Sequence, residues 1–126
     1  MPHLVILYTP QLDRDTDMTA LCHKLADTMI AQRDESGKAV FPVGGTRVLA
    51  YPAAQYAVAD GEQGRAFVYM NMRVTPGRSD ELIKAVGDEL LAAAKAHLAP
   101  VLDKVPLRLT LHIDATPPGY EGKFSS

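Results

Sequence analysis

The chain has 126 residues and a mass of 13.6 kDa, enough for one domain with its own hydrophobic core. Its net charge of −2 and its scattered lysines and arginines exclude a basic nucleic-acid-binding surface. No apolar run approaches the roughly 20 residues that span a bilayer, and the N-terminal region lacks the pattern of a signal peptide. Cys22 is the single cysteine, which excludes a disulfide framework. We therefore expect one cytoplasmic domain over residues 1–126.

The first half of the chain predicts a strand, a helix and a second strand. Residues 3–8 carry apolar side chains at both odd and even positions, which is typical of a central strand covered on both faces. Helix-start residues follow, and apolar residues at spacings of three and four predict a helix over about 17–32. The glycine-rich turn at 41–45 leads into a short strand at 46–51, and residues 52–64 are expected to form a loop, with room for one helical turn.

The second half repeats this pattern. Residues 66–75 alternate between apolar and polar, which predicts a half-buried strand. Ser79 is a suitable N-cap for a second amphipathic helix, which Pro100 should end or kink near its close. Residues 107–115 predict a fourth strand. The tail over 116–126 is a loop, a short edge strand or a segment that reaches a neighbouring subunit.

The element order is β-α-β followed by β-α-β, with pseudo-repeats at about 1–62 and 63–126. Right-handed crossovers place both helices on one face of a four-stranded mixed sheet, so the expected class is α+β. The opposite face would carry both polar and apolar side chains. We interpret that face as a contact surface between subunits.

Pro2 directly precedes the first strand. If Met1 is removed, the Pro2 nitrogen becomes a secondary amine at the end of a buried strand. The reference pKa of an α-amino group is about 7.7–8.0, and burial disfavours its charged form, so the amine could act as a general base near neutral pH. A single proline is also common by chance, and by itself it decides nothing.

Several short motifs occur together in one order, and in that order they resemble the 5-carboxymethyl-2-hydroxymuconate Δ-isomerase family of the tautomerase superfamily. They are Met1-Pro2-His3, Phe41-Pro42 with Gly45 and Arg47, Ala59-Asp60-Gly61, the strand start at 66–70, and Gly77-Arg78-Ser79. The resemblance implies a duplicated β-α-β fold, a homotrimer, and no metal or organic cofactor. It also implies that Pro2 is the catalytic base, and that Arg47 and Arg78 bind the carboxylates of the substrate.

On this resemblance we expect a cofactor-independent isomerase that moves a proton in an unsaturated 2-hydroxy or 2-oxo dicarboxylic acid, in the breakdown of aromatic acids. Two positions differ from the family pattern: Leu49 stands where a second arginine is expected, and residues 63–65 are Gln-Gly-Arg rather than His-Asp-Tyr. These departures bear on the substrate more than on the fold, and they leave open a rival hypothesis, a trimeric binding or structural protein without isomerase activity. A ferredoxin-like ligand-sensing domain, dimeric or monomeric, is a third hypothesis.

The other candidate residues have structural interpretations. His3 should face away from Pro2 because side chains alternate along a strand. The remaining histidines lack the spacing of metal ligands, so we expect no metal site. Cys22 lies on the apolar stripe of the first helix, and we interpret it as core filler. Arg73 and Arg108 are expected to form ion pairs at the subunit interface.

Overall fold

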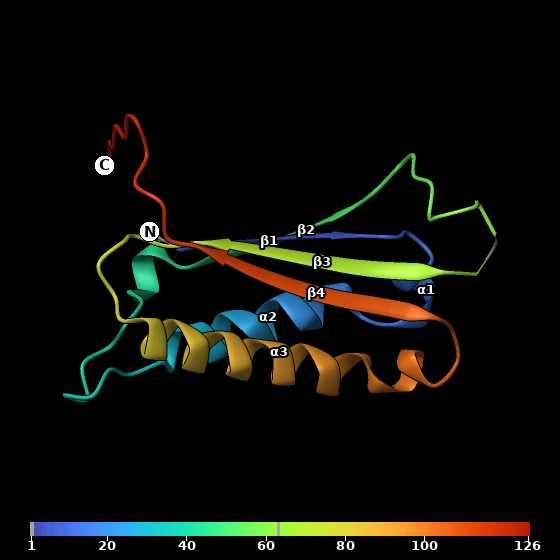
Figure 1. Ribbon diagram of the computed structural model, residues 1–126, viewed down its shortest axis with the longest axis horizontal. Coiled ribbons are helices and arrows are strands. Elements are labelled where there is room, and N and C mark those ends of the chain that lie inside the picture. Colours follow the sequence, from blue (N-terminus) through green and yellow to red (C-terminus); the bar gives the residue numbers. More distant parts are fainter. Residues whose placement is uncertain (1, 63) are drawn as a thin grey trace.

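A four-stranded sheet and two long helices form the two layers of the computed structural model, which describes residues 2–62 and 64–126 (Figure 1). The strands are β1 (His3–Tyr8), β2 (Arg47–Pro52), β3 (Ala66–Arg73) and β4 (Leu107–Asp114). Their order is β2-β1-β3-β4, with β1 parallel to β2, β3 parallel to β4, and β1 antiparallel to β3. The mixed sheet of the duplicated β-α-β arrangement is therefore confirmed.

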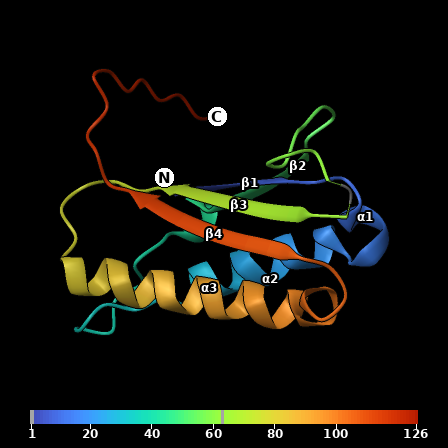
Figure 2. The ribbon, with the colours of Figure 1, turned by 45° about the vertical axis from the view of Figure 1, so that its right-hand side comes forward.

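The two long helices, α2 (Met18–Ile30) and α3 (Asp80–Leu102), cover one face of this sheet in both views (Figures 1 and 2). Each begins at a side-chain cap: Asp17 accepts a hydrogen bond from the Ala20 amide at 2.9 Å, and Ser79 accepts one from the Leu82 amide at 3.2 Å. The prediction that both helices lie on one face is confirmed. No helix within the described ranges is long and apolar enough to cross a bilayer.

Some local predictions need correction. Residues Leu12–Asp15 form a separate one-turn helix, α1, because the Thr9 and Pro10 carbonyls accept hydrogen bonds from the amides of Leu12 and Asp13. Pro100 does not end α3, which continues to Leu102, since the missing proline amide removes only one bond close to the helix end. The loop after β2 contains turns and bends, and no helical turn in its described residues.

The core lies between the helices and the sheet. Alternate residues of β1 and β3 point into it, and the buried stripes of α2 and α3 meet them; the fully covered members include Leu4, Ile6, Met70, Met72, Leu21, Leu25, Leu90 and Leu98. The opposite face, which we call the open face, is not covered in the single chain, since Leu7 of β1 is 43% exposed. The expectation that β1 is covered on both faces is therefore wrong for one subunit taken alone.

The candidate site residues lie at one end of the sheet, which we call the proline end. At this end β1 and β2 begin while β3 and β4 finish, as the strand registers require. The 3-10 turn η1 (Val43–Gly45), the start of α3 and the beginning of the C-terminal tail lie there as well (Figures 1 and 2). The tail then extends on the open-face side, away from the helices.

Candidate functional site

Pro2 is buried at the start of β1. Its carbonyl accepts a hydrogen bond from the Arg47 amide at 3.2 Å, which extends the parallel ladder between β1 and β2 by one residue. The next residue, His3, is exposed, so the two side chains alternate as predicted. The main chain thus fixes Pro2 directly beside Arg47, at a place where an amine would be partly shielded from water.

Arg47 begins β2, and its side chain turns back toward η1. Its Nη1 donates to the Gly44 carbonyl at 3.2 Å, and the side chain is exposed. A guanidinium has five N–H donors, so most of its donors stay available for an anion. The structure therefore makes the main chains of Pro2 and Arg47 neighbours, while the Arg47 guanidinium is held at the Gly44 carbonyl.

Arg78 lies in the turn between β3 and α3, at the same end of the sheet. Its Nη1 donates to the Thr75 carbonyl at 2.7 Å and its Nη2 to the Val40 carbonyl at 3.1 Å. The guanidinium also lies over the ring of Phe41, with its central carbon 5.2 Å from the ring centroid. Sequence reasoning missed this contact with Phe41, because the two residues are far apart in the chain and only the fold makes them neighbours.

A small groove of about 110 Å³ lies at the proline end, between the end of β3 and the C-terminal tail. Arg73 lines it on the sheet side, and Lys123 and Glu121 line it on the tail side. Lys123 Nζ donates to Glu121 at 2.8 Å, and this hydrogen bond lowers the pKa of the Glu121 carboxyl. Arg73 lies opposite His3 in the β1–β3 register, so it adds a further cation near the start of β1.

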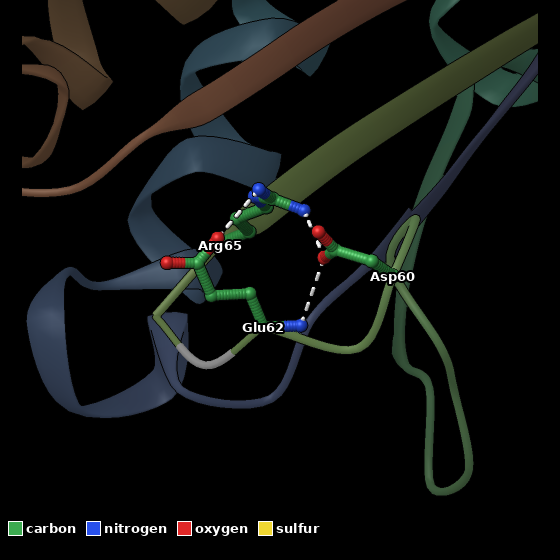
Figure 3. Close-up of polar contacts among 3 residues, drawn as sticks. All are labelled: Asp60, Glu62 and Arg65. Atoms are coloured by element: carbon green, nitrogen blue, oxygen red, sulfur yellow. Dashed lines mark hydrogen bonds and ion pairs between the residues drawn. The ribbon is translucent and has the colours of Figure 1, made fainter.

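Arg65 lies in the segment that differs from the family pattern, of which Gln63 is outside the described residues. Its Nη1 pairs with Asp60 and its Nη2 with Glu62 at 2.7 Å (Figure 3). Asp60 also accepts a hydrogen bond from the Glu62 amide at 3.1 Å. These contacts hold the loop after β2 together, and they direct the Arg65 charge to the loop's own carboxylates rather than to a ligand.

The open face combines polar pairs with exposed apolar side chains. Tyr69 and His112 are joined at 3.0 Å, and Asn71 donates to Asp114 at 2.9 Å. On the other side of β1, Leu49 of β2 is 37% exposed, and it pairs in register with Val5 of β1. The leucine that replaces the expected second arginine thus joins an apolar strip on this face.

A larger cleft of about 730 Å³ lies at the opposite end of the sheet, beside α1 and the start of α2. Tyr8 forms part of its wall and donates a hydrogen bond to Asp13 at 2.7 Å. Cys22 also lines the cleft, and burial raises the pKa of its thiol. A thiol with a raised pKa is a poor nucleophile at neutral pH, which agrees with a packing role for Cys22.

Tyr8 provides a pH-dependent prediction. Burial, the hydrogen bond to Asp13 and the Asp13 charge raise its pKa from 10.0 to about 12. The folded state keeps the phenol proton at pH values where the unfolded chain loses it, so the free energy of unfolding should fall as the pH rises from about 10 to about 12. Denaturant titrations across this range should show the decrease. The Tyr8→Phe variant should lose this component of the decrease, and an unchanged pH dependence in that variant would contradict the prediction.

The remaining candidates do not form a metal site. Within the described ranges, no three side chains among His, Cys, Asp and Glu gather closely enough to hold an ion. His97 contacts the Asp17 carbonyl at 2.9 Å and Thr16 at 3.3 Å, and therefore packs α3 against the start of α2. At this end of the sheet, Asp13, Asp17 and His97 thus have structural partners.

Comparison with known proteins places these features in a family. The family model described as 5-carboxymethyl-2-hydroxymuconate isomerase matches residues 2–126. The chain is 26% identical over 118 residues to the 5-carboxymethyl-2-hydroxymuconate Delta-isomerase of Escherichia coli, covering 94% of this chain and 89% of that protein. These matches span the proline end and both β-α-β units.

Solved structures agree. A crystal structure of a 5-carboxymethyl-2-hydroxymuconate delta-isomerase superposes with a TM-score of 0.94 at 48% identity, over 99% of this chain and 89% of the other. The isomerase of Deinococcus radiodurans R1 gives a TM-score of 0.86 at 32% identity, over 99% and 90%. A fused 4-OT protein that forms a symmetric trimer gives 0.53 at 26% identity, over 90% and 85%. The fold is therefore that of the tautomerase superfamily.

Proposed function

The chain belongs to the 5-carboxymethyl-2-hydroxymuconate isomerase family and is an isomerase, and from this premise we propose that Pro2 is its general base. The observation that carries the proposal is the burial of Pro2 directly beside Arg47. The substrate we propose is an unsaturated 2-hydroxy or 2-oxo dicarboxylic acid. Because muconates are six-carbon diacids that form when an aromatic ring is opened, we place the reaction in the breakdown of aromatic acids, in the cytoplasm.

In the proposed reaction, removal of Met1 exposes the Pro2 nitrogen as a neutral secondary amine. This nitrogen takes a proton from the substrate, either from the 2-hydroxyl or from a carbon next to the carbonyl, and the substrate becomes a dienolate. The protonated proline then returns the proton to another carbon of the conjugated chain, so that a double bond shifts and the amine is regenerated. One base of near-neutral pKa serves both transfers, and no group outside the chain is consumed.

The arginines have a complementary role in this proposal. Arg47 lies beside the base and offers free N–H donors to one substrate carboxylate, and Arg78 offers its remaining donors to the other. Both cations also stabilise negative charge on the dienolate and disfavour protonation of the neighbouring amine. The two arginines thus bind the substrate and keep the Pro2 amine neutral.

Arg47→Met tests the proposed carboxylate contact. Charge-assisted hydrogen bonds are worth about 1.5–3 kcal/mol, so kcat/KM should fall by about 10- to 150-fold. The measurement is the initial rate with 5-carboxymethyl-2-hydroxymuconate, followed by its ultraviolet absorbance. Arg14→Met, an exposed arginine of α1 at the far end of the sheet, is the matched control and should keep its rate. Equal losses of kcat/KM in both variants would contradict a role for Arg47 in substrate binding.

We also propose that the working form is a homotrimer assembled through the open face, with Arg73 and Arg108 pairing with acidic groups there. The exposed apolar strip supports this: Leu7, Leu49 and Tyr51 are 43%, 37% and 51% exposed and adjoin in register. A trimer is also the state of the fused 4-OT relative. Sedimentation equilibrium should give three times the 13.6 kDa chain mass. A monomer or dimer would contradict the proposed trimer.

Activity separates the proposal from its rival, a trimer that binds without catalysis. Purified chain, with Met1 removal verified by intact mass, is mixed with 5-carboxymethyl-2-hydroxymuconate and with a panel of unsaturated 2-oxo acids. The proposal expects turnover of at least one diacid. A correctly processed trimer that turns over none of them would establish the rival.

A further inference from the structure

We propose that Phe41 is a positioning residue for Arg78: its buried ring holds the guanidinium in the orientation in which it meets a substrate carboxylate. The inference rests on the proposed function, since it assigns to Arg78 a ligand of that kind. Its evidence is the contact geometry around Arg78 and the place of Phe41 in the chain.

The first observation is that Phe41 offers a rigid platform. The side chain is 1% exposed and belongs to the main core, so packing holds the ring in one orientation. The guanidinium carbon of Arg78 lies over the ring at 5.2 Å from its centroid, within the range of a cation–π contact. A half-buried cation gains more from such a contact than one in open water.

The second observation is that two main-chain carbonyls fix the guanidinium in its plane. Val40 and Thr75 accept from different nitrogens, at 3.1 and 2.7 Å, and they come from two different segments of the chain. Together with the ring they restrain both the position and the rotation of the group. Two of the five N–H donors are used, and the others remain for a carboxylate. An arginine held in this way loses less side-chain entropy when it binds an anion.

The third observation links this platform to Pro2. Phe41 directly precedes Pro42, whose carbonyl accepts hydrogen bonds from the amides of Gly45 and Thr46 at 3.2 and 3.1 Å and so closes the η1 turn. The next residue is Arg47, whose amide donates to the Pro2 carbonyl. One short, hydrogen-bonded segment therefore joins the ring under Arg78 to the strand pair that holds the proposed base. Phe41 can set the position of Arg78 relative to Pro2.

Phe41→Leu tests the inference, because leucine fills much of the buried volume and removes the aromatic face. We expect KM for 5-carboxymethyl-2-hydroxymuconate to rise about five- to tenfold, with kcat changed less than twofold, from a lost cation–π contact of about 1 kcal/mol. In an Arg78→Met background the same change should raise KM no further. Leu25→Val, a buried change in α2 away from Arg78, controls for general loosening of the core and should leave KM unchanged.

A second measurement does not depend on activity. The ¹⁵N order parameter of the Arg78 Nε–H group, assigned by its loss in Arg78→Lys, should fall in Phe41→Leu and stay unchanged in Leu25→Val. An unchanged order parameter would overturn the inference, as would an equal rise of KM in the Arg78→Met background. If the wild-type chain turns over no diacid, the proposed function fails, and the order parameter alone then decides whether Phe41 positions Arg78.

Discussion

Replacing Pro2 with alanine is expected to lower kcat/KM by about 10²- to 10⁴-fold, the range that a positioned general base contributes to a proton transfer. Alanine keeps an α-amine but removes the pyrrolidine ring that fixes the nitrogen at the start of β1. The buried position of residue 2 and its main-chain bond to Arg47 should keep the strand in place. The loss should therefore appear in the rate and leave the thermal unfolding temperature nearly unchanged.

The matched control is Pro106→Ala, an exposed proline before β4 at the opposite end of the sheet. Its carbonyl bond to the Ala66 amide does not depend on the ring, so its rate should equal that of the wild type. A chain that retains Met1 should be at least as inactive as the Pro2 variant, since the acylated Pro2 nitrogen has no useful basicity, whereas alanine keeps an amine. Undiminished turnover in Pro2→Ala, with Met1 removal verified by mass, would show that another group is the base.

Leu90→Ala is expected to have the largest effect on stability, a decrease of about 2–5 kcal/mol in the free energy of unfolding. Leu90 is 0% exposed in the middle of α3, where it packs in the core between the helix layer and the sheet. Truncation removes apolar contacts and leaves a cavity that the long helix cannot easily close. Urea denaturation followed by circular dichroism measures the change.

Leu91→Ala is an unusually close control, since it makes the same substitution at the next position of the same helix. Leu91 is 39% exposed, so its truncation creates no buried cavity. The free energy of unfolding should fall by well under half as much as in Leu90→Ala. Equal costs at the two positions would show that the Leu91 side of α3 is covered in solution.

The amphipathic helices and their starts could be predicted from the sequence because their causes are local. The expected helix over about 17–32 is found as Met18–Ile30, and Ser79 caps α3 as predicted. The separate turn α1 was not predicted, because it depends on main-chain bonds to Thr9 and Pro10 rather than on an apolar stripe. The single-domain assignment over residues 1–126, with its two pseudo-repeats, stays a prediction.

The candidate site, too, could be predicted from the sequence only in part. The first residues show that Pro2 directly precedes a strand, and the motif order was enough to identify the family. The role of Pro2, and those of Arg47 and Arg78, stay predictions until the variants are measured. What could not be predicted was the immediate surroundings of each arginine, for example whether a guanidinium faces a carbonyl, a carboxylate or open solvent.

The sequence by itself determined the four strands, the two long helices, their order and the mixed sheet. Hydrophobic period, caps and turn residues act over a few positions, and crossover handedness is a general rule. Only the tertiary structure decided that Arg78 rests on Phe41, that Arg65 is held by its own loop, and that one face of β1 is left open. The contact of Arg78 with Phe41 joins segments far apart in the chain, and its geometry depends on the packing of the core. Short sequence patterns cannot predict that packing.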